Sequence, residues 1–210
     1  MAILNVNPTR MELLRLKRQV VTAKRGHKLL SEKQDGLMQK FMEIIREAKV
    51  MRKEVEEKLG MAFKSFMLVS AVMYPKIIEQ ALMFPKAKVS LDVKTKNVMS
   101  VLIPEFELTQ EGDVHSYGFL QSSGDLDISL GVLSEILTLL VNLAQIEQSA
   151  KLLAEEIEKT RRRVNALEYV LIPDLEETVK FIQMKLSEQE RAAITNTMII
   201  KDMMEAEAAA

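Results

Sequence analysis

The 210-residue chain contains no cysteine and no tryptophan, and it has only two histidines. Without cysteine it can form neither a disulfide nor a thiolate metal site, and this composition fits an intracellular protein. His27 and His115 lie far apart and belong to no His-x-x-x-His pair, which argues against zinc. The first residues also lack the basic-then-apolar pattern of a secretory signal. We therefore expect no metal site and no secretion.

Glycine and proline are scarce, with seven and five residues. No glycine-rich run is followed by Lys-Ser or Lys-Thr, so a nucleotide-binding P-loop is excluded. Carboxylates are abundant, but their spacing puts them on charged helix faces rather than in a pocket suited to acid–base chemistry. We expect no catalytic residue, no cofactor and no enzymatic activity of the chain itself.

Long hydrophobic runs and an excess of one charge are also missing. The most apolar stretch, residues 130–146, is interrupted by Glu135, Asn142 and Gln145 and is shorter than a bilayer requires, which favours a buried helix. The formal net charge of −1 argues against a dedicated nucleic-acid-binding protein. The 14 methionines favour packing seams and partner surfaces, because the methionine side chain is adaptable.

The first third of the chain has an apolar residue at every third or fourth position in strict alternation. This average spacing of 3.5 residues is the pattern of a coiled coil, since it keeps one stripe of a helix facing a partner. After Val55 the stripe shifts by one position, which is a stutter. The predicted seam residues are Leu13, Leu16, Val20, Ala23, His27, Leu30, Gln34, Leu37, Phe41, Ile44, Ala48, Met51, Val55, Leu59, Ala62, Phe66, Val69 and Met73.

The last third repeats the pattern, with one break. Pro173 should kink the helix there, because the proline ring displaces the carbonyl four residues earlier. The predicted seam residues are Ile136, Leu139, Leu143, Ile146, Ala150, Leu153, Ile157, Thr160, Val164, Leu167, Leu171, and then Leu175, Val179, Ile182 and Leu186.

The middle of the chain differs from both ends. Residues 87–104 alternate apolar and polar side chains around a turn-prone Thr95-Lys96-Asn97, which predicts a β-hairpin. Residues 112–127 are typical of a loop, and Asp125 or Asp127 could cap the helix that follows. We therefore divide the chain into a helix at 1–73, a central region with a short helix and the hairpin at 74–125, and a helix at 126–210.

Two helices of similar length, joined by about fifty residues, can fold back on one another. The predicted fold is all-α dominated: a long antiparallel two-helix coiled coil of the terminal segments, with a small central β-hairpin and short helices. It would form one slender structural unit. A parallel homodimer is the alternative.

Basic residues cluster on the first helix and again at 161–163, without interleaved carboxylates that would support the helix. A solvated face is one interpretation, and an acidic partner surface is the other. Nucleic acid fits less well, since no aromatic residues are interleaved for base stacking.

Gly26 and Gly36 lie inside a helix, where each costs about 1 kcal/mol relative to alanine and indicates close approach of another backbone. His27 falls on the seam and is expected to be a packed, hydrogen-bonded core histidine. If residues whose numbers sum to roughly 200 pair in the hairpin, His27 faces the Pro173 kink. Its imidazole N–H could then bond the carbonyl of Tyr169 that Pro173 leaves free.

Three segments resemble one family. The stretch NPTRMELLRLKRQVVTAKRGHKLLSEKQDGL is similar to the N-terminal signature of the D-subunits of V-type and A-type ATPases. RRRVNALEYVLIPDLEETVKFIQMKLSEQER resembles their C-terminal signature, and NVMSVLIPEF their central strand. The resemblance covers nearly the whole chain, in order, and the length suits a prokaryotic member. The motifs match at Arg10, Arg25, Gly26, His27, Arg162, Arg163 and Asn165.

The resemblance implies a non-catalytic rotor shaft of the central stalk, which transmits torque between ATP turnover in the catalytic hexamer and ion translocation by the membrane ring. Its implied partners are the hexamer of catalytic A and regulatory B subunits, the small F-subunit of the central stalk, and a funnel-shaped subunit above the membrane ring. It implies a peripheral location at the cytoplasmic face, with no direct membrane insertion and no nucleic acid. Seam and kink positions of the shaft are Gly26, His27, Gln34 and Pro173.

We expect the basic residues to contact the stator and an apolar group to contact the F-subunit. The stator-contact candidates are Arg10, Arg15, Lys17, Arg18, Lys24, Arg25, Arg161, Arg162 and Arg163. The candidates for the F-subunit are Phe63, Phe66, Met67, Tyr74, Leu137, Leu140 and Val141, for which packing within the hairpin is an equal alternative. Other functions compatible with the residues are a prefoldin-like coiled-coil chaperone, a nucleic-acid-binding coiled-coil arm and a tether. Whether Na⁺ or H⁺ is carried is set by other subunits.

Overall fold

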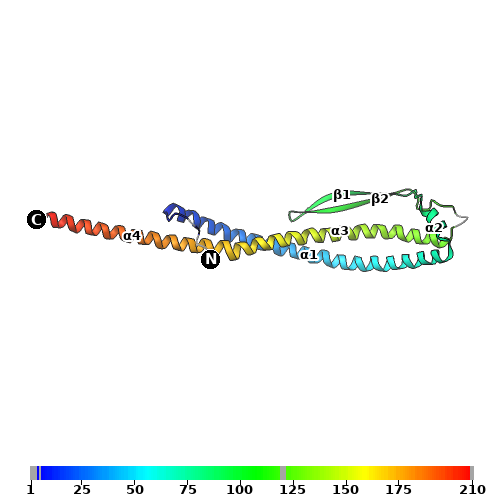
Figure 1. Cartoon of the computed structure of the whole chain (residues 1–210), viewed down its shortest axis with the longest axis horizontal. Helices are drawn as coiled ribbons and strands as arrows, with labels where there is room; N and C mark the ends of the chain where they lie inside the picture. Colours follow the sequence, from blue (N-terminus) through cyan, green and yellow to red (C-terminus); the bar gives the residue numbers. More distant parts are fainter. Residues whose placement is uncertain (1–3, 5, 119–121, 209–210) are drawn as a thin grey trace. The chain divides into compact units, whose positions relative to one another are not determined.

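The computed structural model describes residue 4, residues 6–118 and residues 122–208. The chain forms α1 (Arg10–Val72), α2 (Pro75–Leu82), β1 (Lys88–Val98), β2 (Val101–Glu111), α3 (Gly124–Ala166), a π-helical turn at Leu167–Leu171, and α4 (Ile172–Ala208) (Figure 1). The predicted long helices and hairpin are confirmed. Two compact units are formed: a terminal unit of Met1–Asp35 with Glu158–Ala210, and a central unit of Gly36–Ile157.

In the terminal unit, α1 packs antiparallel against the α3–α4 segment. Two ion pairs show the direction, since Arg10 contacts Glu190 and Lys24 contacts Glu176, each at 2.6 Å. As residue numbers rise along α1, they fall along α4. The seam residues Leu16, Leu175 and Ile182 are buried together, with partly buried neighbours packed around them. Thr178 is fully buried and its Oγ1 accepts a hydrogen bond from the Leu4 amide at 3.1 Å, which holds Leu4 against α4.

In the central unit, the same antiparallel pairing places Leu37 of α1 beside Leu153 and Ile157 of α3. An ion pair between Arg52 of α1 and Glu147 of α3 fits the same antiparallel arrangement, since the higher number on α1 pairs with the lower number on α3. Near the end of α1, Val69 is buried with Leu126 of α3 and Ile78 of α2. Pro75 begins α2 and lacks an N–H group, so α1 ends shortly before it.

Apart from one residue, every predicted seam position is buried or half-buried. The exception is Leu171, which is 46% exposed. It lies in the π turn, where the amide of Ile172 bonds the carbonyl of Leu167, five residues back. A π turn contains one extra residue, which rotates the following side chains by about 100° relative to an α-helix. The prediction that Leu171 lies on the seam is therefore wrong, and the next seam residue is Leu175.

The β-hairpin is longer than predicted, and its turn lies later in the chain. Val98 pairs with Val101, so Met99 and Ser100 form the turn, with φ angles of 52° and 71°. The predicted turn at Thr95–Asn97 is wrong, because these residues continue β1. Asn97 instead supports the turn, since its Oδ1 accepts a hydrogen bond from the Ser100 amide at 2.9 Å.

Pro104 lies inside β2, opposite Thr95, and does not end the hairpin. Counting pairs from the two-residue turn places Pro104 at a site that makes no inter-strand hydrogen bond, so its missing N–H disturbs no pairing. Phe106, two residues further, has the same orientation and donates its amide to Gln145 Oε1 of α3 at 2.9 Å. The outer edge of β2 therefore lies against α3, as Figure 1 shows for the central unit.

The hairpin turn rests on α1 at Gly36. A Cβ atom built on Gly36 would lie 2.7 Å from Cε of Met99, so the absence of a side chain here lets Met99 approach the helix. Val101 is buried in the same cluster as Leu37 and Leu153. The close approach expected at Gly36 is thus made by a side chain. For Gly26, apart from the backbone of its own helix and its chain neighbours, no described atom lies within 4 Å of the corresponding position, so the expected close neighbour is not found there.

Neither Asp125 nor Asp127 caps α3, contrary to the prediction. The helix begins at Gly124, so Ser123 occupies the capping position and both aspartates lie in the first turn. Carboxylates are favourable there because they face the positive end of the helix dipole. Asp127 instead accepts a hydrogen bond from the Tyr117 hydroxyl.

The shared core of α1, α3 and the hairpin predicts a large effect of Leu153→Ala. Leu153 is fully buried, so the variant should lose about 2–5 kcal/mol of unfolding free energy, measured by urea denaturation. The matched control is Leu29→Ala, because Leu29 is exposed on α1 and its loss should change stability by about 0.5 kcal/mol or less. Equal effects of the two substitutions would contradict the packing.

Candidate interaction surfaces

All nine basic residues predicted to contact a stator are exposed, and all lie in the terminal unit. Arg10 and Lys24 form the ion pairs between helices described above. Arg15 lies 3.5 Å from Glu12, and Arg162 pairs with Glu158 one turn earlier. Within the described part of the chain, the other five make no ion pair: Lys17, Arg18, Arg25, Arg161 and Arg163. The terminal unit therefore presents unneutralised positive charge.

His27 lies on the seam, as predicted, and faces the turn that precedes Pro173. Its Nε2 is 3.6 Å from Glu168 Oε2, a distance too long for a hydrogen bond. This nitrogen is buried and has no hydrogen-bond partner among the described residues, so it does not bond the Tyr169 carbonyl. The prediction that His27 lies on the seam beside the Pro173 turn is confirmed, whereas the predicted hydrogen bond to the Tyr169 carbonyl is wrong. The π turn re-forms the backbone bonding at this point by moving to a five-residue step.

An apolar face occupies the end of α1 in the central unit. Phe63 and Met67, four residues apart, lie on one side of α1 and are exposed, and Tyr74, in the extended link before α2, is exposed as well. Leu140 of α3 is exposed as well, whereas Leu137 and Val141 are half-buried. Phe66 instead packs against the core cluster of Val69 and Leu126. Of the seven residues predicted for this surface, the most accessible are therefore Phe63, Met67, Tyr74 and Leu140.

A second apolar stripe on α1 was not predicted. Val50, Met61, Leu68 and Val72 are spaced by 11, seven and four residues, which places them along one side of the helix, and each is exposed. Val50 and Ile146 of α3 line one open groove there. The signal in the sequence is that α1 becomes apolar beside the seam on both flanks from about residue 59 onward. A single stripe repeating every 3.5 residues does not reveal this widening.

The continuous helical segment Gly124–Met204 contains an 18-residue window of mean hydropathy 1.7, apolar and long enough to cross a membrane by composition alone. Only 17% of that window is buried. The buried residues of α3, such as Ile136 and Leu143, belong to the seam. The expectation of a buried helix therefore holds for one side of α3, and its other sides remain exposed.

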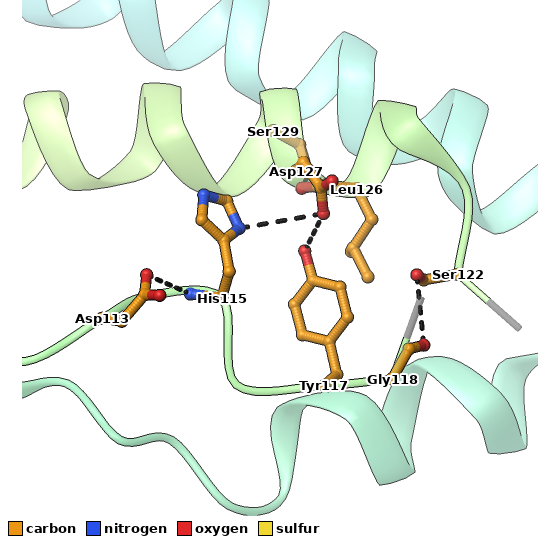
Figure 2. Close-up of polar contacts among 8 residues, drawn as sticks. All are labelled: Asp113, His115, Tyr117, Gly118, Ser122, Leu126, Asp127 and Ser129. Atoms are coloured by element: carbon orange, nitrogen blue, oxygen red, sulfur yellow. Dashed lines mark hydrogen bonds and ion pairs between the residues drawn. The ribbon is translucent and has the colours of Figure 1, made fainter. Parts of the chain in front are cut away.

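A polar cluster fastens the loop before α3 to that helix (Figure 2). The Tyr117 hydroxyl donates a hydrogen bond to Asp127 Oδ1, and the His115 Nδ1 lies 3.7 Å from the same oxygen. The amide of His115 donates to Asp113 Oδ1 at 3.0 Å. Burial, together with the bond to Asp127, raises the pKa of Tyr117. The cluster acts as a structural fastening, with the phenol kept protonated.

In the described ranges, no group of three or more His, Asp or Glu side chains is placed to hold a metal ion. The grooves of the terminal unit are lined mainly by apolar and basic side chains rather than by paired carboxylates.

The fold and these surfaces define an antiparallel helix-pair protein with a β-hairpin insertion. Residues 12–202 match the family model of the ATP synthase D-subunits, and the chain belongs to this family. It is 54% identical to the V-type ATP synthase D-subunit of Fusobacterium nucleatum, with 99% of this chain and 100% of the relative covered. The proteins of the same name from Clostridium novyi and Acetivibrio thermocellus are 51% and 53% identical, covering 99% and 97% of this chain and 98% and 94% of those relatives.

The Tyr117 cluster predicts that the protein loses stability at alkaline pH. Because its pKa is raised, the folded state favours the protonated phenol. The resulting stability is complete below the ordinary pKa of about 10 and is lost as pH rises through the raised value. Tyr117→Phe should lose about 1–3 kcal/mol at pH 7, measured by chemical denaturation, since Asp127 loses its donor.

The difference between the wild type and Tyr117→Phe should shrink above about pH 10, where the wild type loses its advantage. Tyr169→Phe is the matched control, since Tyr169 is exposed and should leave stability unchanged. A difference that is zero at pH 7, or constant with pH, would show that the phenol does not fasten the loop.

Proposed function

We propose that this chain is the shaft of the central stalk in a V/A-type rotary ATPase. In this role it transmits torque between ATP turnover in a catalytic hexamer and ion translocation by a membrane ring. The chain itself performs no chemistry. It works as a peripheral subunit at the cytoplasmic face of the membrane. Membership of the D-subunit family supports the complex, and the paired helices support the mechanical role.

The apolar seam is the observation that carries this proposal. Within each of the two units, side chains of α1 interlock with those of the returning helix, apart from the local change at the π turn. Sliding one helix along the other would separate these contacts, so a pair resists twisting better than a single helix. The ion pairs Arg10–Glu190 and Arg52–Glu147 connect the same helices at their exposed edges.

The exposed surfaces suit partners of different kinds. The positive charge of the terminal unit suits a surrounding hexamer of A and B subunits that presents carboxylates. The exposed apolar side chains of Phe63, Met67, Tyr74 and Leu140 suit the small F-subunit. A funnel-shaped subunit would connect the stalk to the membrane ring. Different faces of the shaft would bias otherwise similar catalytic sites toward different states, which is population shift by differential contact.

Isolation of the intact complex tests the proposal. A tagged chain purified after gentle solubilisation should bring A, B and F subunits with it. Recovery of unfolded client proteins would favour a chaperone instead. Binding to RNA or DNA at micromolar affinity, weakening steeply with salt, would favour a nucleic-acid-binding arm.

Charge reversal at Arg162 and Arg163 should weaken binding to the hexamer of A and B subunits by about tenfold at low salt. The loss should be smaller at high salt, because ions screen exposed charges. Binding can be measured with purified hexamer by surface plasmon resonance. The control is Lys76→Glu with Lys86→Glu, which makes the same charge change on exposed residues of the central unit. An unchanged affinity of the arginine variant would count against this surface.

A further inference from the structure

The terminal unit contains an open apolar groove between the first turns of α1 and the π turn. Its volume is about 830 Å³. The large apolar side chains of its lining come from both helices and from the segment that precedes α1, and they are Leu4, Met11, Leu14, Leu167, Leu171 and Leu175. Among the described residues no acidic side chain lines it, and Arg15 and Arg18 are the charged residues that do.

The groove follows from the local change in the seam. On the α3–α4 side, the π turn rotates Leu171 out of the seam and leaves it 46% exposed. On the α1 side, Leu14 lies beside the seam residues Leu13 and Leu16 and is 58% exposed. Both side chains therefore present apolar surface to the groove that no described residue covers.

The charge at the groove is of one sign. Arg18 makes no ion pair among the described residues, and Arg15 lies 3.5 Å from one carboxylate of its own helix. The neighbouring groove, of about 440 Å³, gives a contrast. It is lined by Val20, Val21 and Val179, and its Lys17 and Lys180 are accompanied by Glu176. Of these two grooves, the first alone combines exposed leucines with two guanidinium groups and no acidic residue in its lining.

We propose that this groove docks a short protein segment in which an apolar side chain stands beside one or two carboxylates. The apolar side chain would cover Leu14 and Leu171, and the carboxylates would bind Arg15 and Arg18, because guanidinium groups suit carboxylates. This proposal rests on the proposed function, since the segment would belong to the inner wall of the hexamer. The exposed Arg25 continues the positive charge along α1 beyond the groove, which fits an extended protein surface better than a free amphiphile.

Photo-crosslinking in the assembled complex identifies the occupant. A photoreactive phenylalanine analogue, p-benzoylphenylalanine, replaces Leu14 or Leu171, and mass spectrometry maps the crosslinked peptide. Both positions should crosslink to the same type of segment, containing Asp or Glu within a few residues of a large apolar residue. Val21 is the control, because it is 49% exposed on the same turns of α1 but lines the other groove. It should give no crosslink to that segment.

Charge reversal tests the arginines separately. Arg15→Glu with Arg18→Glu should weaken hexamer binding by about tenfold or more. Lys180→Glu with Lys185→Glu makes the same charge change on exposed residues of α4 in the same unit, and should weaken binding by less than about threefold. Circular dichroism of each variant reports whether the helices are still formed.

Equal losses from the two double variants would overturn the proposal, because they would indicate general attraction rather than a defined groove. Crosslinks to a segment without carboxylates, or a fatty acid retained in native mass spectrometry, would overturn it as well. If wild-type chain binds the hexamer and the Arg15/Arg18 variant binds equally well, the groove is unused and the proposed function stands. If wild-type chain binds no hexamer, the proposed function itself fails.

Discussion

Within each of the two units, the packing of α1 against the returning helix along an apolar seam holds the other elements in place. A stripe that recurs every 3.5 residues can be buried only by a second helix carrying the same spacing, and the chain supplies that helix itself. Antiparallel pairing follows, with Arg10 near Glu190 and Arg52 near Glu147. Every other feature is attached to this pair: the hairpin through Val101 and Phe106, and the α2 segment through Ile78.

The places where the seam departs from regularity are the places where exposed apolar surface and the attached hairpin occur. At the π turn, Leu171 leaves the seam and helps to form an apolar groove. At Gly36, the absence of a side chain lets Met99 and the hairpin rest on α1. Toward Val72, α1 becomes apolar on both flanks, more than one partner helix can cover.

The sequence predicted the helices and nearly all of their buried faces, because a 3.5-residue repeat encodes them directly. It misplaced Leu171, since a π turn depends on how the chain restores hydrogen bonding ahead of Pro173, and spacing does not report this. It misplaced the hairpin turn, because Met99 and Ser100 adopt positive φ angles that their residue types do not favour. The exposed basic residues were predicted, whereas the groove beside Arg15 and Arg18 required the three-dimensional arrangement of two helices.

Rotation of the chain inside its complex is the most direct test of the account. With the hexamer of A and B subunits fixed to a surface and a bead attached to an exposed residue of the central unit, ATP addition should turn the bead in one direction, in discrete steps. Steady ATP hydrolysis with a bead that does not turn, under conditions where the chain is bound to the hexamer, would contradict the claim that this helix pair transmits torque.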